Sequence, residues 1–573
     1  MVSEPAIAFN NKLYIPQKKT HLIMTHDIDA MHWADKIALE VKKRVENDEI
    51  LNKVVKEKGY IVYDEKTPSG KIHIGSGRGW IIHDAIAKSL KDLGLNAKFV
   101  LSSDDMDPYD KPNKDLPKEF DNYLGMPFRN IPSPVEGYKS FADYYFRQAT
   151  EKFEEFGINA EFESTGEQYI KGNFNETIKI ALNNSEKIKE IYLRFYDKVK
   201  MILPFNPICE KCGKIGTTEA YEWDLKKETV KYRCKKDYVE WTEGCGYEGE
   251  ISPYNGNGKL PWKVEWAAKW PVKGVICELA GKDHFTFGGS RSISIAISDE
   301  VYNFPPPYPS TRKSIGKGYE FFTVGGKKMS SSKGEGVGFS EVTDFVPANL
   351  LRYLLIATRP HAVMDFNPIG TNDVILLYER YDKTERIYFG KEKPDNGQEI
   401  VKNRRIYELA HIGKIQKKIP PQISLIHAAT VIQVALNEDK AIEMLKKSGN
   451  IAKKISKEDL SYIKKRLTFA KKWVENCAPE DFRFVLQDNV SHVKISEKEK
   501  EAIKEVLNIL KNKKIGDKEL HEEFYNICKN VGLDTKDFFK AAYRVLINKD
   551  KGPRLAAFII DIKEKAIEMF ERV

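Results

Sequence analysis

The chain has 573 residues, of which 41% are hydrophobic and 31% are charged, a composition typical of soluble globular proteins with three or four domains. It contains no apolar run near the roughly 18 residues that cross a bilayer, and its first residues lack the pattern of a signal peptide. These features argue against a membrane-spanning or exported protein and predict a cytoplasmic one, whereas a net charge of +9 is too small to identify a partner.

The first predicted elements form a β-α-β unit. Residues 59–64 (GYIVYD) have the pattern of a buried strand, residues 75–96 that of a helix ending near Gly94, and residues 97–105 that of a second strand. This order predicts a parallel sheet of the nucleotide-binding α/β type, which binds ligands at the carboxyl ends of its strands.

The glycine-rich turn before the predicted helix, TPSGKIHIGSGRG (residues 67–79), is the first candidate site. A helix start favours anions through its unpaired N–H groups and its dipole. His73 and Ser76 can donate to phosphate oxygens, and Gly75 and Gly77 let a ligand approach the backbone. The alternative is a turn with an incidental histidine, but the position between a strand and a helix favours a phosphate site.

Residues 141–255 are predicted to form an insertion with a cysteine cluster. Cys209 and Cys212 have the two-residue spacing of zinc ligands, and Cys234 and Cys245 would complete the site, although ten residues separate that second pair. The alternative is four reduced, unliganded thiols. Because four thiolates leave no open coordination position, the predicted Zn²⁺ is structural.

The α/β pattern resumes in residues 256–346, which include the loop KKMSSSKG (residues 327–334). Such a cationic loop suits closure over a triphosphate, although alone it would indicate only a flexible surface loop. After Pro347 the pattern is almost entirely helical. We therefore divide the chain into an N-terminal, partly helical extension (1–58), a catalytic domain in two parts (59–140 and 256–346), the insertion (141–255) and a helical region (347–573).

Two motifs, HIGS (residues 73–76) and KMSSS (residues 328–332), resemble the signatures of class I aminoacyl-tRNA synthetases. The resemblance narrows to the archaeal-type, class I lysyl-tRNA synthetases because further segments occur in family order, among them DDMDPYDK, LPWKVEWAAKW, AGKDHFTFGGS and LLRYLLIATRPHAVMDFNP. It covers roughly residues 59–573. It implies an α/β, Rossmann-type parallel-sheet catalytic domain, an inserted zinc-binding region, and an all-α C-terminal region that contacts the tRNA stem and anticodon.

The resemblance also implies roles for matching residues. His73 would stabilise the pentavalent phosphorus when the carboxylate of lysine attacks the α-phosphate of ATP, and Lys328 would bind the β- and γ-phosphates. The expected ATP contacts are His73, Gly75, Ser76, Asp283, His284, Lys328 and Lys333, and the expected lysine contacts are Glu65, Thr67, Asp104, Trp266, His284 and Tyr319. The implied ligands are ATP with Mg²⁺, L-lysine and tRNA-Lys, with no role for DNA or a membrane.

Acidic residues near the predicted strand ends favour a cationic substrate independently of the resemblance. Asp64, Glu65, Asp104, Asp105 and Asp107 stand there, and an ammonium group needs carboxylates or aromatic faces. A glutamate-specific relative would need an arginine or lysine instead. The alternative for each acid is a cap on a turn or helix.

The chain also departs from the family pattern. Ser331 stands where a lysine is usual, which leaves Lys333 as a second phosphate contact, while Ser76 replaces a histidine and Glu65 a common glycine. Some relatives have a second zinc site, and we expect a single zinc here because the matching positions are Ser133, Gly137, Tyr138 and Tyr144.

We therefore expect a lysine–tRNA ligase that forms lysyl-adenylate and transfers lysine to the 2′-hydroxyl of the terminal adenosine. The alternatives are a synthetase of the same class for another amino acid, glutamate first, and a catalytically altered tRNA-binding relative, which Glu65 and Ser76 keep open. A small-molecule nucleotidyltransferase would not need a helical region of about 220 residues.

Overall fold

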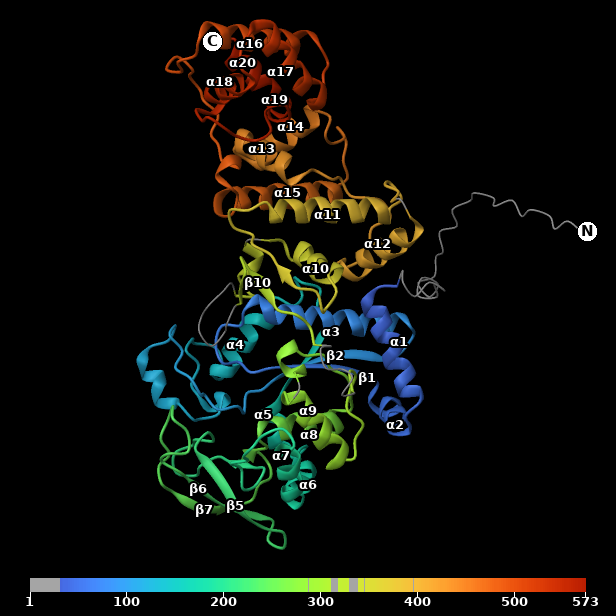
Figure 1. The fold of residues 1–573 in the computed structure, drawn as a ribbon, viewed down its shortest axis with the longest axis vertical. Coiled ribbons are helices and arrows are strands. Elements are labelled where there is room, and N and C mark those ends of the chain that lie inside the picture. Colours follow the sequence, from blue (N-terminus) through green and yellow to red (C-terminus); the bar gives the residue numbers. More distant parts are fainter. Residues whose placement is uncertain (1–30, 287, 311–317, 329–337, 345, 395) are drawn as a thin grey trace, which may run out of the picture.

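The computed structural model of the protein describes residues 31–573 except 287, 311–317, 329–337, 345 and 395, and it is elongated (Figure 1). The α/β part and the insertion form one end, and the C-terminal helices are stacked toward the other. In the part of the chain that the structure describes, no helix is both long and apolar enough to cross a bilayer.

A four-stranded parallel sheet is the centre of the α/β part. Its order is β3 (Ala160–Ser164), β2 (Ala97–Ser103), β1 (Tyr60–Lys66) and β9 (Val275–Cys277). The crossover between β1 and β2 is α3 (Ile74–Asp92). The predicted β-α-β unit and parallel sheet are therefore confirmed.

Helices cover both faces of this sheet. Successive side chains of a strand point to opposite faces, and in β1 Asp64 reaches His83 of α3 while Glu65 reaches Lys269 of α8 (Trp262–Lys273). Consequently α3 and α8 lie on opposite faces, and α9 (Ser290–Glu300) packs against α8.

The end of the predicted N-terminal extension packs into the same body. Helices α1 (Trp33–Glu46) and α2 (Glu49–Lys58) contribute buried residues to the main hydrophobic core, and α1 packs on α3. Arg405 binds Asp35 of α1 at 2.7 Å, which links this segment to the helical region.

One strand of the central sheet falls inside the predicted insertion. β3, preceded by α4 (Phe141–Thr150), is an edge strand whose sequence AEFES is partly exposed, with Phe162 50% exposed. It lacks the apolar run of a buried parallel strand, which is why the sequence did not reveal it.

The rest of the insertion is a set of short helices and an antiparallel sheet of order β5-β6-β7. These elements are α5 (Thr165–Ile170), α6 (Asn175–Asn183), α7 (Ser185–Leu193), β4 (Asn206–Pro207), β5 (Thr218–Asp224), β6 (Thr229–Cys234) and β7 (Glu248–Ile251). β4 pairs with β8 (Gly258–Lys259), which lies just beyond the predicted insertion.

The helical C-terminal region is confirmed. A small sheet lies at its start: β10 (Phe322–Val324) and β11 (Lys327–Lys328) precede it, and β12 (Met364–Asp365) lies within it. The main core extends to Ala478, and a second core begins at Phe484. The helices are α10 (Ala348–Ala357), α11 (Asp373–Tyr388), α12 (Gly397–Ala410), α13 (Leu425–Ala435), α14 (Glu438–Lys447), α15 (Lys457–Asn476), α16 (Glu497–Asn512), α17 (Asp517–Val531), α18 (Thr535–Ile547), α19 (Leu555–Asp561) and α20 (Lys563–Phe570).

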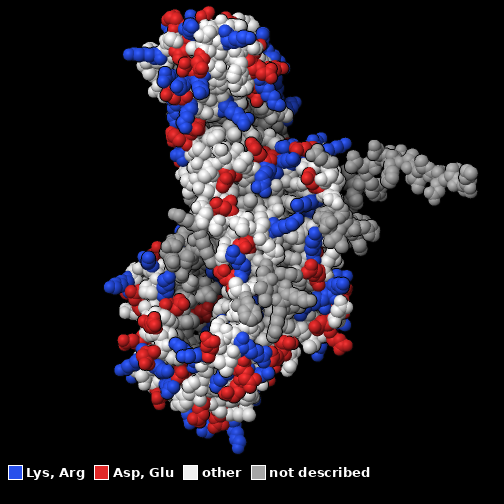
Figure 2. Space-filling model, in the orientation of Figure 1, with Lys and Arg blue, Asp and Glu red and all other residues white. Residues whose placement is uncertain are grey.

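The charged residues on the face drawn in Figure 2 are mixed in sign. Lysine and arginine side chains alternate there with aspartate and glutamate at both ends of the molecule. The modest net charge therefore makes no single broad positive field on this face.

Candidate active site and metal centre

His73 caps the helix that begins at the carboxyl end of β1. Its Nδ1 accepts a hydrogen bond from the backbone N–H of Gly75 at 3.0 Å, and its backbone is extended, as an N-cap requires. Because Nδ1 accepts, the proton of the neutral imidazole stands on Nε2. The predicted turn thus places a hydrogen-bond donor at a helix start, where anions are stabilised.

Two glycines of this turn are required by packing within the protein. A Cβ at Gly75 would lie 2.7 Å from the His73 ring, and one at Gly77 would lie 2.4 Å from the ring of Phe339. From the sequence, we expected Gly75 and Gly77 to let a ligand come close to the backbone. The structure adds a different reason, because both absent side chains make room for rings of the chain itself.

Arg78 joins α3 to the segments that follow β9 in the chain. Its guanidinium is buried and donates to the backbone oxygens of Phe321 at 2.9 Å, Pro360 at 3.0 Å and Ala362 at 2.8 Å. It therefore fixes the first turns of α3 against the residues beside β10 and β12.

A cavity of about 390 Å³ opens at the carboxyl end of the sheet. Its walls come from β1, α3, the segment after β2, α8 and the segment after β9. The lining residues are Asp64, Glu65, Lys66, Thr67, Ser69, Ser76, Trp80, Asp104, Asp107, Trp262, Trp266, Glu278, Leu279, Ala280, Gly281, His284 and Tyr319.

All the predicted lysine contacts meet in this cavity. Its lining includes all six of them, together with Ser76 from the predicted ATP contacts. His73 and Gly75 stand at the start of α3, and Asp283 lies in the short 3₁₀ helix beside His284. The backbone of Lys328 is in β11, whereas Lys333 lies outside the described residues.

An internal lysine occupies much of the predicted acidic cluster. The Nζ of Lys269 lies 2.7 Å from Glu65 Oε2, 2.5 Å from Asp104 Oδ1 and 3.3 Å from Glu265 Oε2. Lys269 and Glu265 are fully buried. These carboxylates are therefore held by the chain itself before any substrate arrives.

A second buried lysine, Lys259, completes the network by binding Asp107 and by lying 3.1 Å from Glu265. Asp107 also accepts a hydrogen bond from Thr67 at 2.8 Å. Four carboxylates thus share two ammonium groups, which leaves this wall of the cavity anionic.

The electrostatics of the network follow from this imbalance. Burial raises the pKa of Asp104 to about 6, and burial and the neighbouring Asp104 together raise the pKa of Glu65 well above its ordinary value. Burial opposes the charge of Lys269, but the surrounding carboxylates, Asp104 foremost, outweigh it and raise the pKa of the ammonium. The lysine therefore stays charged while the acids compete for it.

Asp105 does not belong to this site. Its carboxylate accepts hydrogen bonds from Ser164 at 2.6 Å and from the N–H of Gly166 at 2.7 Å, and it lines a separate cavity with Arg129. Asp105 therefore caps a helix, which was the alternative role considered for these acids, because Gly166 is in the first turn of α5.

The aromatic wall is built by α8. Trp266 packs edge to face on His284, with ring centres 5.5 Å apart, and its indole donates to Glu278 at 2.9 Å. Glu278 also accepts from Trp270 at 2.7 Å and from Arg291 at 2.8 Å.

Sequence reasoning missed Lys259, Glu265, Lys269, Glu278 and Arg291. The i, i+4 spacing of Glu265 and Lys269 was a usable signal, since it places both on one side of a helix. The other three are brought in from separate segments and had no local signal.

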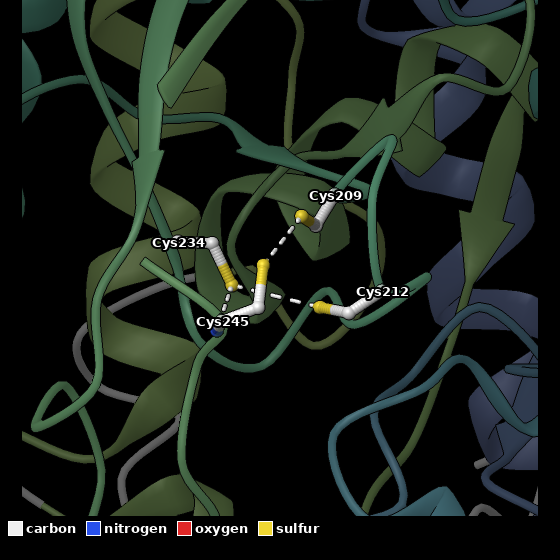
Figure 3. A group of neighbouring side chains, drawn as sticks. All are labelled: Cys209, Cys212, Cys234 and Cys245. Atoms are coloured by element: carbon white, nitrogen blue, oxygen red, sulfur yellow. Dashed lines mark hydrogen bonds between the residues drawn. The ribbon is translucent and has the colours of Figure 1, made fainter. Parts of the chain in front are cut away.

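The four cysteines of the insertion come together in space (Figure 3). Their sulfur atoms all lie within 4.8 Å of one another, with 3.6 Å between Cys209 and Cys245 and 3.7 Å between Cys212 and Cys234. Gly213 and Gly246 have φ of 72° and 76°, so each follows a cysteine with the left-handed turn that a glycine permits. The cluster can hold one tetrahedral metal ion.

Comparison with known proteins assigns the chain to a family. The family model described as tRNA synthetases class I (K) matches residues 31–413. The chain belongs to the class I tRNA synthetases for lysine. The match begins at residue 31, so the family model includes α1 and α2, which the motifs alone had left unassigned.

The similarity to relatives in this family covers almost the whole chain. A Lysine--tRNA ligase of Methanosphaera stadtmanae is 32% identical over 94% of this chain and 99% of its own. One from Methanocaldococcus jannaschii is 34% identical over 92% of this chain and 97% of its own. A solved glutamate tRNA ligase from Elizabethkingia meningosepticum is 14% identical with a TM-score of 0.36, covering 90% of this chain and 99% of that one.

Proposed function

We propose that the chain is a lysine–tRNA ligase that activates lysine with ATP and transfers it to the 2′-hydroxyl of the terminal adenosine of tRNA-Lys. The observation that carries this proposal is the similarity to Lysine--tRNA ligases over more than nine-tenths of both chains. The anionic cavity at the carboxyl end of the sheet supports it, because a lysine side chain is cationic.

The first step is an in-line displacement at phosphorus. An oxygen of the lysine carboxylate attacks the α-phosphorus of ATP, the bond to the bridging oxygen breaks, and pyrophosphate leaves with the electron pair. His73 donates from Nε2 to the α-phosphate and Lys328 stabilises the leaving charge. Mg²⁺ supplies further neutralisation of the phosphates when it is bound.

In the second step the 2′-hydroxyl attacks the carbonyl carbon of lysyl-adenylate. The new ester bond forms, AMP leaves, and the hydroxyl proton is transferred to the phosphate oxygen or to water. Both steps depend on positioning in a partly dry cavity, with no covalent enzyme intermediate.

A groove of about 980 Å³ in the helical region supports tRNA binding. One wall is α15, which presents Lys457, Ser461, Lys464, Thr468 and Lys472 at successive spacings of three or four residues, so that they share one side of the helix. The floor consists of buried aromatic side chains from α11 and α12. Cationic side chains over a rigid floor suit an RNA phosphodiester backbone.

We expect the double variant Lys457→Ala, Lys465→Ala to weaken binding of tRNA-Lys about tenfold and to lower the slope of log K against log salt by about one per lysine. Both residues line the groove. Binding would be measured by filter retention at several salt concentrations.

The matched control is Lys471→Ala, which removes an exposed lysine of α15 that does not line the groove. Equal losses in both proteins would mean that the groove has no special part in RNA binding.

We further propose that the cysteine cluster holds a structural Zn²⁺. Four thiolates at a Zn–S distance of about 2.3 Å place sulfurs about 3.8 Å apart in a tetrahedron, close to the separations of 3.6 and 3.7 Å observed here. The N–H of Cys245 and the hydroxyl of Thr217 lie 3.3 and 3.2 Å from the sulfur of Cys234, as donors to a thiolate would. The ion would fix the insertion, because the cysteines join otherwise separate loops.

Cys209→Ser should abolish most of the zinc that the purified protein carries and open the insertion to proteases, because three remaining thiolates bind the ion much less tightly. Metal content by mass spectrometry and limited proteolysis check this. Cys528→Ser, in the second core, is the control and should keep its zinc. A Cys209→Ser protein with full zinc would contradict the four-thiolate site.

The function itself is tested by charging total tRNA from a matched source with each radiolabelled amino acid. We expect lysine alone to become attached to tRNA. Attachment of glutamate would support the alternative substrate, and no attachment by folded protein would support a catalytically altered tRNA-binding relative.

A further inference from the structure

Asp64 is distinguished among the carboxylates that line the active-site cavity. Glu65, Asp104, Asp107 and Glu278 each bind a lysine or arginine directly. Within the described part of the chain, no lysine or arginine nitrogen lies within 4.0 Å of the Asp64 carboxylate. Its recorded partners are the N–H of Glu65, 2.9 Å from Oδ1, and Nδ1 of His83, 3.4 Å from Oδ2.

The histidine beside Asp64 does not neutralise it. The backbone N–H of Leu279 donates to Nε2 of His83 at 2.9 Å, and Nδ1 lies 2.8 Å from the carbonyl oxygen of Gly79. Nε2 is thus an acceptor and the single ring proton is on Nδ1, since a second proton would face the Leu279 N–H. The neutral ring orients Asp64 and leaves its negative charge for a ligand.

Asp64 lies beside Tyr319 in the wall of the cavity. A Cβ built on Gly79 would be 2.6 Å from Tyr319 Oη and 3.1 Å from Asp64 Oδ2, so these two groups converge where α3 has no side chain. Gly79 is four residues beyond Gly75, which at 1.5 Å per residue is about 6 Å along α3 from the phosphate end.

A cation stands on the same side of β1, two residues nearer the carboxyl end of the strand. Lys66 follows Asp64 by two residues, so both side chains belong to the same face of the strand, roughly 7 Å apart along it. Lys66 lines the cavity, and no carboxylate of the described residues lies within ion-pair distance of it. The strand therefore offers the cavity a negative charge at Asp64 and a positive one two residues further along at Lys66.

We propose that Asp64 binds the side-chain ammonium of the amino-acid substrate and makes this ammonium a requirement for activation. Lys66 then faces the α-carboxylate of the same substrate. This inference rests on the proposed function and deepens it. A neutral side chain would leave the Asp64 carboxylate desolvated and unpaired, which is the situation in which a site rejects an analogue most strongly. The other carboxylates of the cavity cannot bind the substrate ammonium in the same way, because Lys259, Lys269 and Arg291 already hold them.

The test is amino-acid-dependent ATP–pyrophosphate exchange with lysine and with norleucine, which has the same chain without the terminal ammonium. Asp64→Asn should lower kcat/KM for lysine about 100-fold or more and leave the KM for ATP within about threefold. The value for norleucine should stay level or rise, so discrimination collapses. The control is Glu65→Gln, whose carboxylate is held by Lys269, and it should move both substrates in parallel.

Asp64→Glu provides a second measurement that does not depend on loss of activity. It advances the carboxylate by one methylene, so it should raise the ratio of kcat/KM for ornithine to that for lysine about tenfold. The proposal would be overturned if Asp64→Asn still rejected norleucine as strongly as the unmodified protein and if Asp64→Glu left the ratio of kcat/KM for ornithine to that for lysine unchanged. If the unmodified protein neither activates lysine in the presence of tRNA-Lys nor attaches lysine to tRNA, the proposed function itself fails instead.

Discussion

Replacing Lys269 with methionine should lower the melting temperature of the catalytic domain by roughly 10 °C, since breaking a buried ion pair costs about 3–5 kcal/mol. The Lys269 side chain is fully buried, and its Nζ is the shared partner of Glu65, Asp104 and Glu265. Methionine fills a similar volume but leaves these acids without their cation. Differential scanning calorimetry measures the effect.

Two variants give this prediction its controls. Lys269→Arg keeps the positive charge and should recover much of the loss. Lys263→Met lies on the same helix but contacts tyrosines, with its Nζ 4.4 Å from the ring centre of Tyr196, and should change the melting temperature by only a few degrees. If Lys269→Met melts like Lys263→Met, the network does not contribute to stability as described.

His73→Ala should lower kcat for adenylate formation by about 10²–10³-fold while the KM for ATP changes only a few-fold, because the Nε2 donor acts where charge develops in the transition state. Lysine-dependent ATP–pyrophosphate exchange gives both constants. The substitution also removes the cap on the Gly75 N–H, which costs about 1 kcal/mol of stability.

The capping role and the chemical role are separated by His73→Asn. Asparagine is a good N-cap residue but does not reproduce the donor at Nε2. A rate as low as that of His73→Ala is expected. Recovery of the rate in His73→Asn would mean that the histidine only starts the helix.

The sequence predicted the parallel sheet, the crossover helix and the turn that holds His73 because their signals are local. A buried apolar strand, a glycine-rich turn and an amphipathic helix each follow from short-range patterns. α3 begins at Ile74, one residue from its predicted start, and ends at Asp92, just before Gly94. By contrast, β3 is an exposed edge strand, and it becomes a strand because it pairs with β2 and not because of a local sequence pattern.

The charges of the cavity were harder to predict. The cluster of Glu65, Asp104 and Asp107 was visible in the sequence. Its partners Lys259 and Lys269 are more than 150 residues away along the chain, and 165 residues separate Asp104 from Lys269. Pairing across such distances depends on tertiary structure. A count of acids near strand ends therefore overstated how many of them are left for a substrate.

The division of the molecule into two hydrophobic cores bears on long-range communication. Among the described residues, contacts between the two sides include the packing of α13 on α19 and the hydrogen bond that the backbone N–H of Phe484 donates to Gln433 at 2.9 Å. Such a narrow junction lets each side open independently. An event at the distal helices can influence the cavity through α13 and this link, or through an RNA that touches both.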